Sequence, residues 1–136
     1  MRRNNSRDSK IYTDWMIYAE NDLRAAGMLR HNKNTLLLSA FHSHQAIEKT
    51  LKAFVLNQKG YAPDGHNIIF LCKTASRLNE GFLDKIDECI ELNNYYIQTR
   101  YPPDFPLDID KAKAKRLLTF AKEIYVFTLN ELAKFN

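Results

Sequence analysis

The segment Ser39–Phe54, "SAFHSHQAIEKTLKAF", repeats apolar residues at the spacing of an α-helix. Its apolar stripe contains His44 and Glu48, which lie one turn apart where a core-facing helix normally carries aliphatic side chains. A buried carboxylate without a partner costs several kcal/mol, so Glu48 needs a cation, a proton or a cleft that admits water. The segment therefore predicts a long helix that brings polar groups into the contact with its neighbours.

The composition is typical of one folded domain. The chain has 136 residues, of which 45% are hydrophobic and 26% are charged, with only four glycines and four prolines. This size suits a single core, and so few turn-forming residues argue against an all-β protein. The formal net charge is +4, but residues 1–10 hold four basic residues and one acidic residue, a net +3. We therefore expect a basic, flexible arm over residues 1–10 and a single domain over residues 11–136.

Several patterns favour a cytoplasmic protein. Cys72 and Cys89 are the only cysteines, they do not form a CxxC motif, and each lies at or beside an apolar-periodic position. The N-terminus lacks the apolar core of a signal peptide, and no run approaches the roughly 18 apolar residues of a membrane span. We expect reduced, packed thiols and no membrane association.

Helical periodicity continues on both sides of the opening segment. It predicts an all-α fold, an antiparallel up-and-down bundle of four long helices plus a shorter helix. Gly60 should end the second helix, and Asp108 is a candidate cap for the last. Leu83 and Ile90 should belong to the core-facing side of the fourth helix. The predicted helices cover residues 12–30, 35–58, 66–78, 82–99 and 108–134.

Polar residues occupy apolar-periodic positions in three of these helices. Asp22 lies between Tyr18 and Ala25 in the stripe of the first helix, and Asn94 follows the stripe of the fourth. One interpretation is a polar cleft between the first, second and fourth helices, and the other is a network that only fixes helix register. The candidate cleft residues are Asp22, His44, Glu48, Lys49, Lys52, Tyr95, Arg100 and Tyr101.

The sequence favours neither a metal site nor a cofactor. His44 and Glu48 have the spacing of two ligands, but His42 lies on another helix face and no third ligand has suitable spacing. A glycine-rich phosphate loop is also missing, because "GYAPDGHN" at 60–67 lacks the lysine and serine that end such a loop. Chemistry at the cleft would therefore depend on side chains alone.

Four segments occur in an order that covers most of the chain: "AENDLRAA" at 19–26, "HSHQAIEKTLKAF" at 42–54, "GHNIIFLC" at 65–72 and "NNYYIQTRYP" at 93–102. No single segment is diagnostic. As a set, they resemble the HEPN family, the nucleotide-binding helical domains of higher eukaryotes and prokaryotes. Residues 11–136 are thus expected to form a HEPN-like domain.

The resemblance implies a helical bundle that commonly forms homodimers, often beside a minimal nucleotidyltransferase in a toxin–antitoxin pair. It also implies that catalytic members are metal-independent ribonucleases, in which a histidine follows an arginine by a few residues. Arg100 matches the arginine, but "YPPDFPLDID" at 101–110 contains no histidine. The usual acid or base is therefore missing, and ribonuclease activity is not the first expectation.

We expect instead a protein that binds a nucleotide or a nucleotidyltransferase partner. Arg100 and Tyr101 would contact phosphate and base, and the two lysines of the candidate set would supply charge. Tyr95 and Tyr96 would offer a stacking surface, unless they pack in the core.

Two alternatives remain open. The first is a metal-independent ribonuclease toxin with a rearranged site, in which Arg100 stabilises charge and His44 or His66 transfers protons. The second is a purely structural dimerisation module, in which the buried polar groups serve only helix register.

Overall fold

The computed structural model describes residues 8–100, 102 and 108–135, with the backbone alone for residues 97–100. This part of the chain is helical and contains no β-strand. The α-helices are α1 (Tyr12–Leu29), α2 (Leu36–Lys59), α3 (Ile68–Leu78), α4 (Ile86–Arg100) and α5 (Lys111–Ala133). Two 3₁₀ helices, η1 (Lys33–Thr35) and η2 (Glu80–Lys85), precede α2 and α4.

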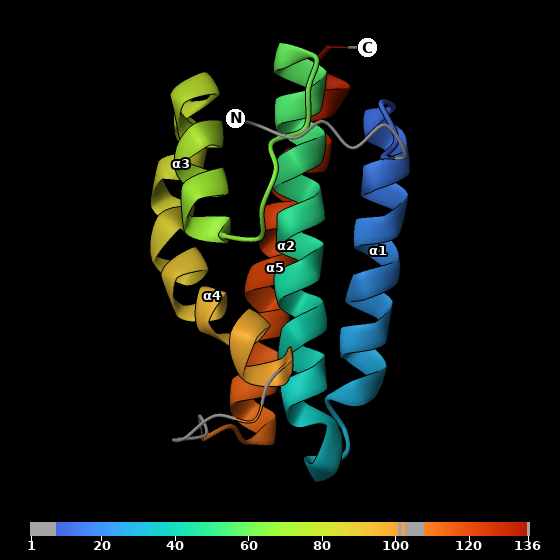
Figure 1. Cartoon of the computed structure of the whole chain (residues 1–136), viewed down its shortest axis with the longest axis vertical. Helices are drawn as coiled ribbons and strands as arrows, with labels where there is room; N and C mark the ends of the chain where they lie inside the picture. Colours follow the sequence, from blue (N-terminus) through green and yellow to red (C-terminus); the bar gives the residue numbers. More distant parts are fainter. Residues whose placement is uncertain (1–7, 101, 103–107, 136) are drawn as a thin grey trace.

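The four long helices form a bundle in which successive members run in opposite directions (Figure 1). Helices α1 and α4 run one way, and α2 and α5 run the other way. The shorter α3 packs beside α4 and points in the same direction as α2. This arrangement confirms the predicted up-and-down bundle of four long helices plus a shorter one.

Helix α2 is central and contacts all four other α-helices. Fifteen of its 24 residues are buried. A helix covered on nearly every side needs apolar or paired side chains all round, which explains why polar residues within α2 must find partners. Small residues such as Ala40, Ala46 and Ala53 are fully buried and allow neighbouring helices to approach closely.

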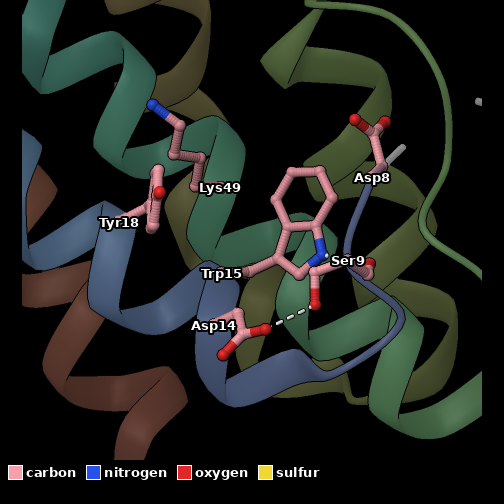
Figure 2. Close-up of a pocket in the computed structure, with 6 residues that line it drawn as sticks. All are labelled: Asp8, Ser9, Asp14, Trp15, Tyr18 and Lys49. Atoms are coloured by element: carbon pink, nitrogen blue, oxygen red, sulfur yellow. Dashed lines mark hydrogen bonds between the residues drawn. The ribbon is translucent and has the colours of Figure 1, made fainter.

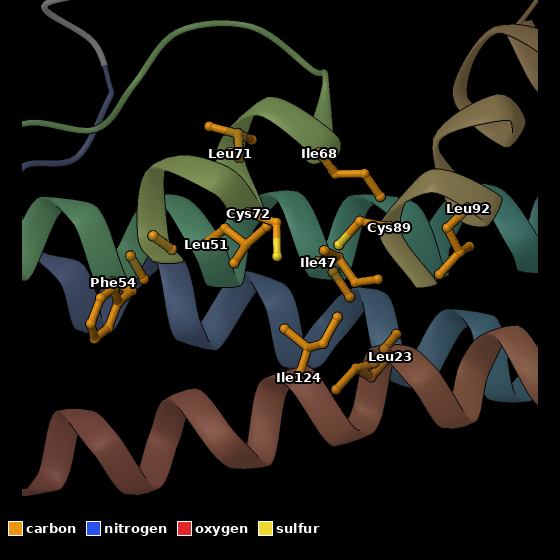
Figure 3. Packing of buried hydrophobic residues seen from close by; sticks show 14 of the residues in the cluster. Leu23, Ile47, Leu51, Phe54, Ile68, Leu71, Cys72, Cys89, Leu92 and Ile124 are labelled. Carbon is orange, nitrogen blue, oxygen red and sulfur yellow. The ribbon is translucent and has the colours of Figure 1, made fainter. Parts of the chain in front are cut away.

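The core forms where side chains from α1, α3, α4 and α5 meet those of α2 (Figure 3). Ile47, Leu51 and Phe54 of α2 are fully or almost fully buried. Phe54 packs on Phe82 with ring centroids 4.9 Å apart, and Phe82 in turn meets Phe127 edge to face at 5.0 Å. These aromatic contacts join α2, η2 and α5.

The connection between α2 and α3 reverses the direction of the chain. Gly60 ends α2 in the left-handed conformation, with φ of 84°, and donates its backbone N–H to the carbonyl of Leu56. The chain then passes back along α2 before α3 begins (Figure 1). Asn67 caps α3 by accepting from the backbone N–H groups of Ile69 and Phe70. Gly60 ends α2 as predicted, whereas α3 begins two residues after the predicted start at residue 66.

The fourth helix differs from the prediction. Residues 80–85 form η2, and the α-helix begins only at Ile86. Leu83 and Ile90 are exposed, whereas Cys89 and Leu92 are buried. Because a 3₁₀ turn advances three residues per turn and Phe82 is fixed in the core, the buried face of α4 is rotated from the one that a continuous helix would have. The expected core face was therefore wrong.

Three further predictions concern the last helix, the thiols and membranes. Asp110, not Asp108, caps α5 by accepting from the backbone N–H of Lys113, since the helix begins one residue after it. Cys72 and Cys89 are unbridged and buried, as expected for packed thiols. No helix within the described residues has both the length and the apolar character to cross a membrane.

Candidate functional site

Asp22 of α1 is held by two side chains of α2. Its side chain is 11% exposed, and one carboxylate oxygen lies 2.5 Å from Lys49 Nζ. The other oxygen lies 2.9 Å from His42 Nδ1. We call these three residues the Asp22 cluster. The buried carboxylate predicted from the sequence is therefore paired, and the pair ties α1 to α2.

Glu48 of α2 is held by a second pair of side chains. It is only 5% exposed, and Lys52 Nζ lies 3.0 Å from its Oε2. His66, just before α3, places Nδ1 3.0 Å from Oε1 and 3.1 Å from Oε2. We call Glu48, Lys52 and His66 the Glu48 cluster. It fixes the start of α3 against the middle of α2.

Tyr96 of α4 completes the surroundings of His66. The two rings stack with centroids 4.6 Å apart and an interplanar angle of 16°. His44 lies on another side of Tyr96, with ring centroids 5.3 Å apart. Tyr95, in contrast, is 3% exposed and belongs to the core. The stacking surface considered for both tyrosines therefore involves Tyr96 alone, because the rotated face of α4 turns Tyr95 inward.

The contacts of His66 determine which ring nitrogen carries a proton. An ionised carboxylate only accepts hydrogen bonds, so His66 Nδ1 must donate to Glu48. In the neutral imidazole, Nε2 is then an acceptor. The His66 side chain is 53% exposed, which leaves the ring accessible from solvent. The arrangement is an imidazole oriented by a buried carboxylate and an aromatic ring, suited to binding polar groups or moving a proton.

The two clusters lie along one helix but share no partner. Lys49 and Lys52 are three residues apart on α2, and each is paired with a different carboxylate. Lys52 Nζ also lies 5.8 Å from the ring centroid of Trp15 in α1. The sequence left open one polar cleft or a network that fixes helix register, and the described residues form two adjacent ion-pair clusters on α2. Of the other candidates, Arg100 ends α4 with its side chain outside the described residues, and Tyr101 lies outside them entirely.

His44 is the most deeply buried member of the candidate set. It is fully buried, and Nδ1 lies 3.2 Å from Gln45 Oε1. No hydrogen-bond partner for Nε2 occurs in the described part of the chain. Burial lowers the pKa of His44, and the negative charge of Glu48 opposes this only in part. His44 therefore lacks the access to solvent that His66 has.

Sequence reasoning missed two contributors, His42 and Trp15, and the stacking partner of a third, Tyr96. His42 was set aside because it does not share a face with His44, but its spacing of seven residues from Lys49 places both toward Asp22. Tyr96 stacks on His66 across elements, which no local pattern reveals. Trp15 of α1 contacts Lys52 of α2, which is also a contact between separate elements. Within the described residues, no three His, Cys, Asp or Glu side chains lie close enough to hold a metal ion.

The HEPN domain model matches residues 12–132. The chain belongs to the HEPN family. That match covers all five α-helices and both clusters of this HEPN domain, apart from the last helical residue.

Two crystal structures have the same fold as this HEPN domain. TT1696 from Thermus thermophilus is 28% identical, with 88% of this chain and 96% of that chain covered and a TM-score of 0.74. ST0689, an archaeal HEPN homologue, is 24% identical, with 90% and 98% covered and a TM-score of 0.71. No curated protein matches the sequence.

The Glu48 cluster should be a major contributor to stability. Glu48→Gln leaves the Lys52 ammonium buried without a counter-charge, and we expect a loss of about 3–5 kcal/mol in the free energy of unfolding. The matched control is Glu91→Gln, because Glu91 also contacts two cations, Lys113 and Arg116, but is more exposed. That change should cost less than about 1 kcal/mol. Urea denaturation measures both.

A double variant separates lost charge from lost packing. Glu48→Gln combined with Lys52→Met removes both charges, and much of the lost stability should return. Equal losses for the Glu48 and Glu91 variants would show that the Glu48 cluster is no more dependent on its charges than a surface pair.

Stability should also depend on pH through His44. Its pKa is lowered in the folded state from the ordinary value of 6.5, so the unfolded chain takes up the proton first as pH falls. The contribution of neutral His44 to stability is therefore complete above pH 6.5 and declines as pH falls below it. Urea denaturation at stepped pH values should show this decline and a shallower one in His44→Gln. The exposed His31→Gln is the control, and an unchanged slope in His44→Gln would contradict the prediction.

Proposed function

We propose that this HEPN protein binds a nucleotide beside His66 and Tyr96, at the exposed edge of the Glu48 cluster. The observation that supports this most directly is the anchored imidazole. His66 donates from Nδ1 to buried Glu48, stacks on Tyr96 and keeps half of its surface exposed. A side chain held in this way loses little conformational freedom when a ligand binds, and this favours affinity.

His66 can recognise both polar parts of a nucleotide. With Nδ1 donating to Glu48, Nε2 of neutral His66 can accept a hydrogen bond from a ribose hydroxyl. Protonated His66 donates from Nε2 to a phosphate oxygen and adds positive charge.

The charges of the clusters limit how phosphate would be bound. Lys49 is neutralised by Asp22, and Lys52 is neutralised by Glu48. The two lysines therefore contribute less attraction than their number in the sequence suggests. In the proposal, phosphate is contacted by protonated His66 and by Arg100, whose guanidinium can bind two oxygens at once.

Family membership supports two further parts of the proposal, a homodimer and a minimal nucleotidyltransferase partner in a toxin–antitoxin pair. Exposed apolar side chains on outer faces of the bundle are candidates for such contacts, for example Ile17 and Met28 on α1 and Val126 and Leu129 on α5. These surfaces lie on elements other than those that hold His66 and Tyr96. Partner binding and nucleotide binding are therefore separable.

Nucleotide binding should raise the melting temperature of the purified protein. A nucleotide at ten times its dissociation constant adds about 1.4 kcal/mol to the native state, which corresponds to about 4 °C for a chain of this size. ATP, GTP and their mono- and diphosphates are titrated to millimolar concentration. His66→Ala should remove the shift, while His31→Ala, at an exposed position, should keep it. The absence of any shift would contradict the proposal and favour the purely structural module.

The same geometry favours metal-independent RNA cleavage as a second candidate. A carboxylate that orients an imidazole is a common arrangement for a general base. His66 Nε2 would take the proton of a ribose 2′-hydroxyl as that oxygen attacks phosphorus. The 5′-oxygen would leave and take up a proton, giving a cyclic phosphate, and Arg100 would stabilise the charge on phosphorus. His44 is less suited to this role because it is fully buried.

Cleavage is tested with labelled transfer RNA in the presence of EDTA. If this candidate holds, cleavage should fall by roughly 10²-fold or more in His66→Ala, the range expected for loss of a general base. Arg100→Ala should also reduce it, and His31→Ala should have no effect. Intact RNA, or cleavage that persists in both His66→Ala and Arg100→Ala, would exclude His66 as the base.

A further inference from the structure

A pocket opens where the chain enters α1. Its volume is about 540 Å³, within the range of small-molecule sites. We call it the Trp15 pocket. Its lining residues are Asp8, Ser9, Asp14, Trp15, Tyr18 and Lys49. Figure 2 shows the indole of Trp15 between Lys49 and Asp8, with Tyr18 beside Lys49.

Two aromatic rings form part of its wall. Trp15 is fixed at its edge, because its indole N–H donates to the carbonyl of Ser9 at 2.8 Å. Tyr18 is exposed although it lies within the apolar-periodic positions of α1. A fixed indole and an accessible phenol ring present negative π faces, which attract organic cations.

The charges of the pocket favour the same class of ligand. Lys49 is matched by Asp22, and Lys52, which lies over the Trp15 ring, is matched by Glu48. Asp14 accepts a hydrogen bond from the Ser9 hydroxyl at 2.7 Å. Among the described residues, neither Asp14 nor Asp8 has a cationic partner. Within that part of the chain, the pocket thus has two uncompensated carboxylates beside two aromatic rings.

From this combination we propose that the Trp15 pocket binds an alkylammonium ligand of the polyamine class. An ammonium group would contact Asp8 or Asp14 and lie against the indole face, while the methylene chain covers the phenol ring of Tyr18. An anionic ligand is disfavoured by the two carboxylates. The proposal does not rest on nucleotide binding at His66, because His66 and Tyr96 are not among the residues that line the pocket.

The pocket contains its own spectroscopic probe, because Trp15 is the only tryptophan in the chain. The full chain is titrated with spermidine at constant ionic strength, and tryptophan emission and heat of binding are recorded. Cadaverine is compared with the neutral diol of the same length, and Mg²⁺ serves as a cation without an alkyl chain. A saturable change with spermidine and cadaverine, absent with the diol and with Mg²⁺, is the expected result.

Substitutions assign the binding to the pocket. Tyr18→Ala should weaken spermidine binding roughly two- to fivefold, as expected for loss of the apolar ring surface that the methylene chain covers. Asp14→Asn keeps the acceptor for Ser9 and should weaken it by a similar factor of about two to five. The combined variant should lose on the order of tenfold. Asp87→Asn, an exposed carboxylate on α4, is the control and should leave binding unchanged.

Three results would overturn the proposal. The first is no saturable signal at millimolar spermidine, and the second is an equal response to Mg²⁺, which would indicate unspecific charge screening. The third is equal weakening by Asp87→Asn and Asp14→Asn. His66→Ala should bind spermidine normally, so a failure of nucleotide binding and a failure of polyamine binding can be told apart.

Discussion

A carboxylate buried against a helix has to be neutralised where it lies, and this requirement governs how α1 and α3 join α2. Asp22 is satisfied only if α1 lies at the height where Lys49 and His42 can reach it. Glu48 has one partner, Lys52, on its own helix, and gains a second only if the segment before α3 brings His66 to the middle of α2. Apolar packing would tolerate small sliding movements of these helices, but two separate ion-pair clusters specify one register.

Much of the fold follows from the sequence because its signals are local. The 3.6-residue period, the left-handed glycine after α2 and the asparagine before α3 each act within a few residues. The fourth helix was misjudged because Phe82 is fixed by Phe54 and Phe127, which lie far away in the chain. That contact favours a 3₁₀ turn and rotates the helix after it. Tyr95 then belongs to the core, and only Tyr96 provides the stacking surface considered for both tyrosines.

The candidate site was harder to predict than the fold for a related reason. Burial of Asp22 and Glu48 could be inferred from their positions within apolar stripes. Their partners could not all be inferred, since His66 and His42 reach them from other elements or other helix faces. The stack of His66 on Tyr96 depends on the same rotation of α4 that the sequence does not reveal. This HEPN domain has no histidine after Arg100. The stack on Tyr96 instead helps to hold the accessible imidazole of His66 next to Glu48.

The return of the chain along α2 also limits how the protein can vary in length. Gly60 follows Glu48 by twelve residues, a distance of about 18 Å along a helix. His66 follows Gly60 by six residues, and such a stretch reaches at most about 20 Å when fully extended. The connection therefore has little slack. Evolution can lengthen this loop outward into solvent at small cost, but deletions within it would draw the imidazole away from its carboxylate.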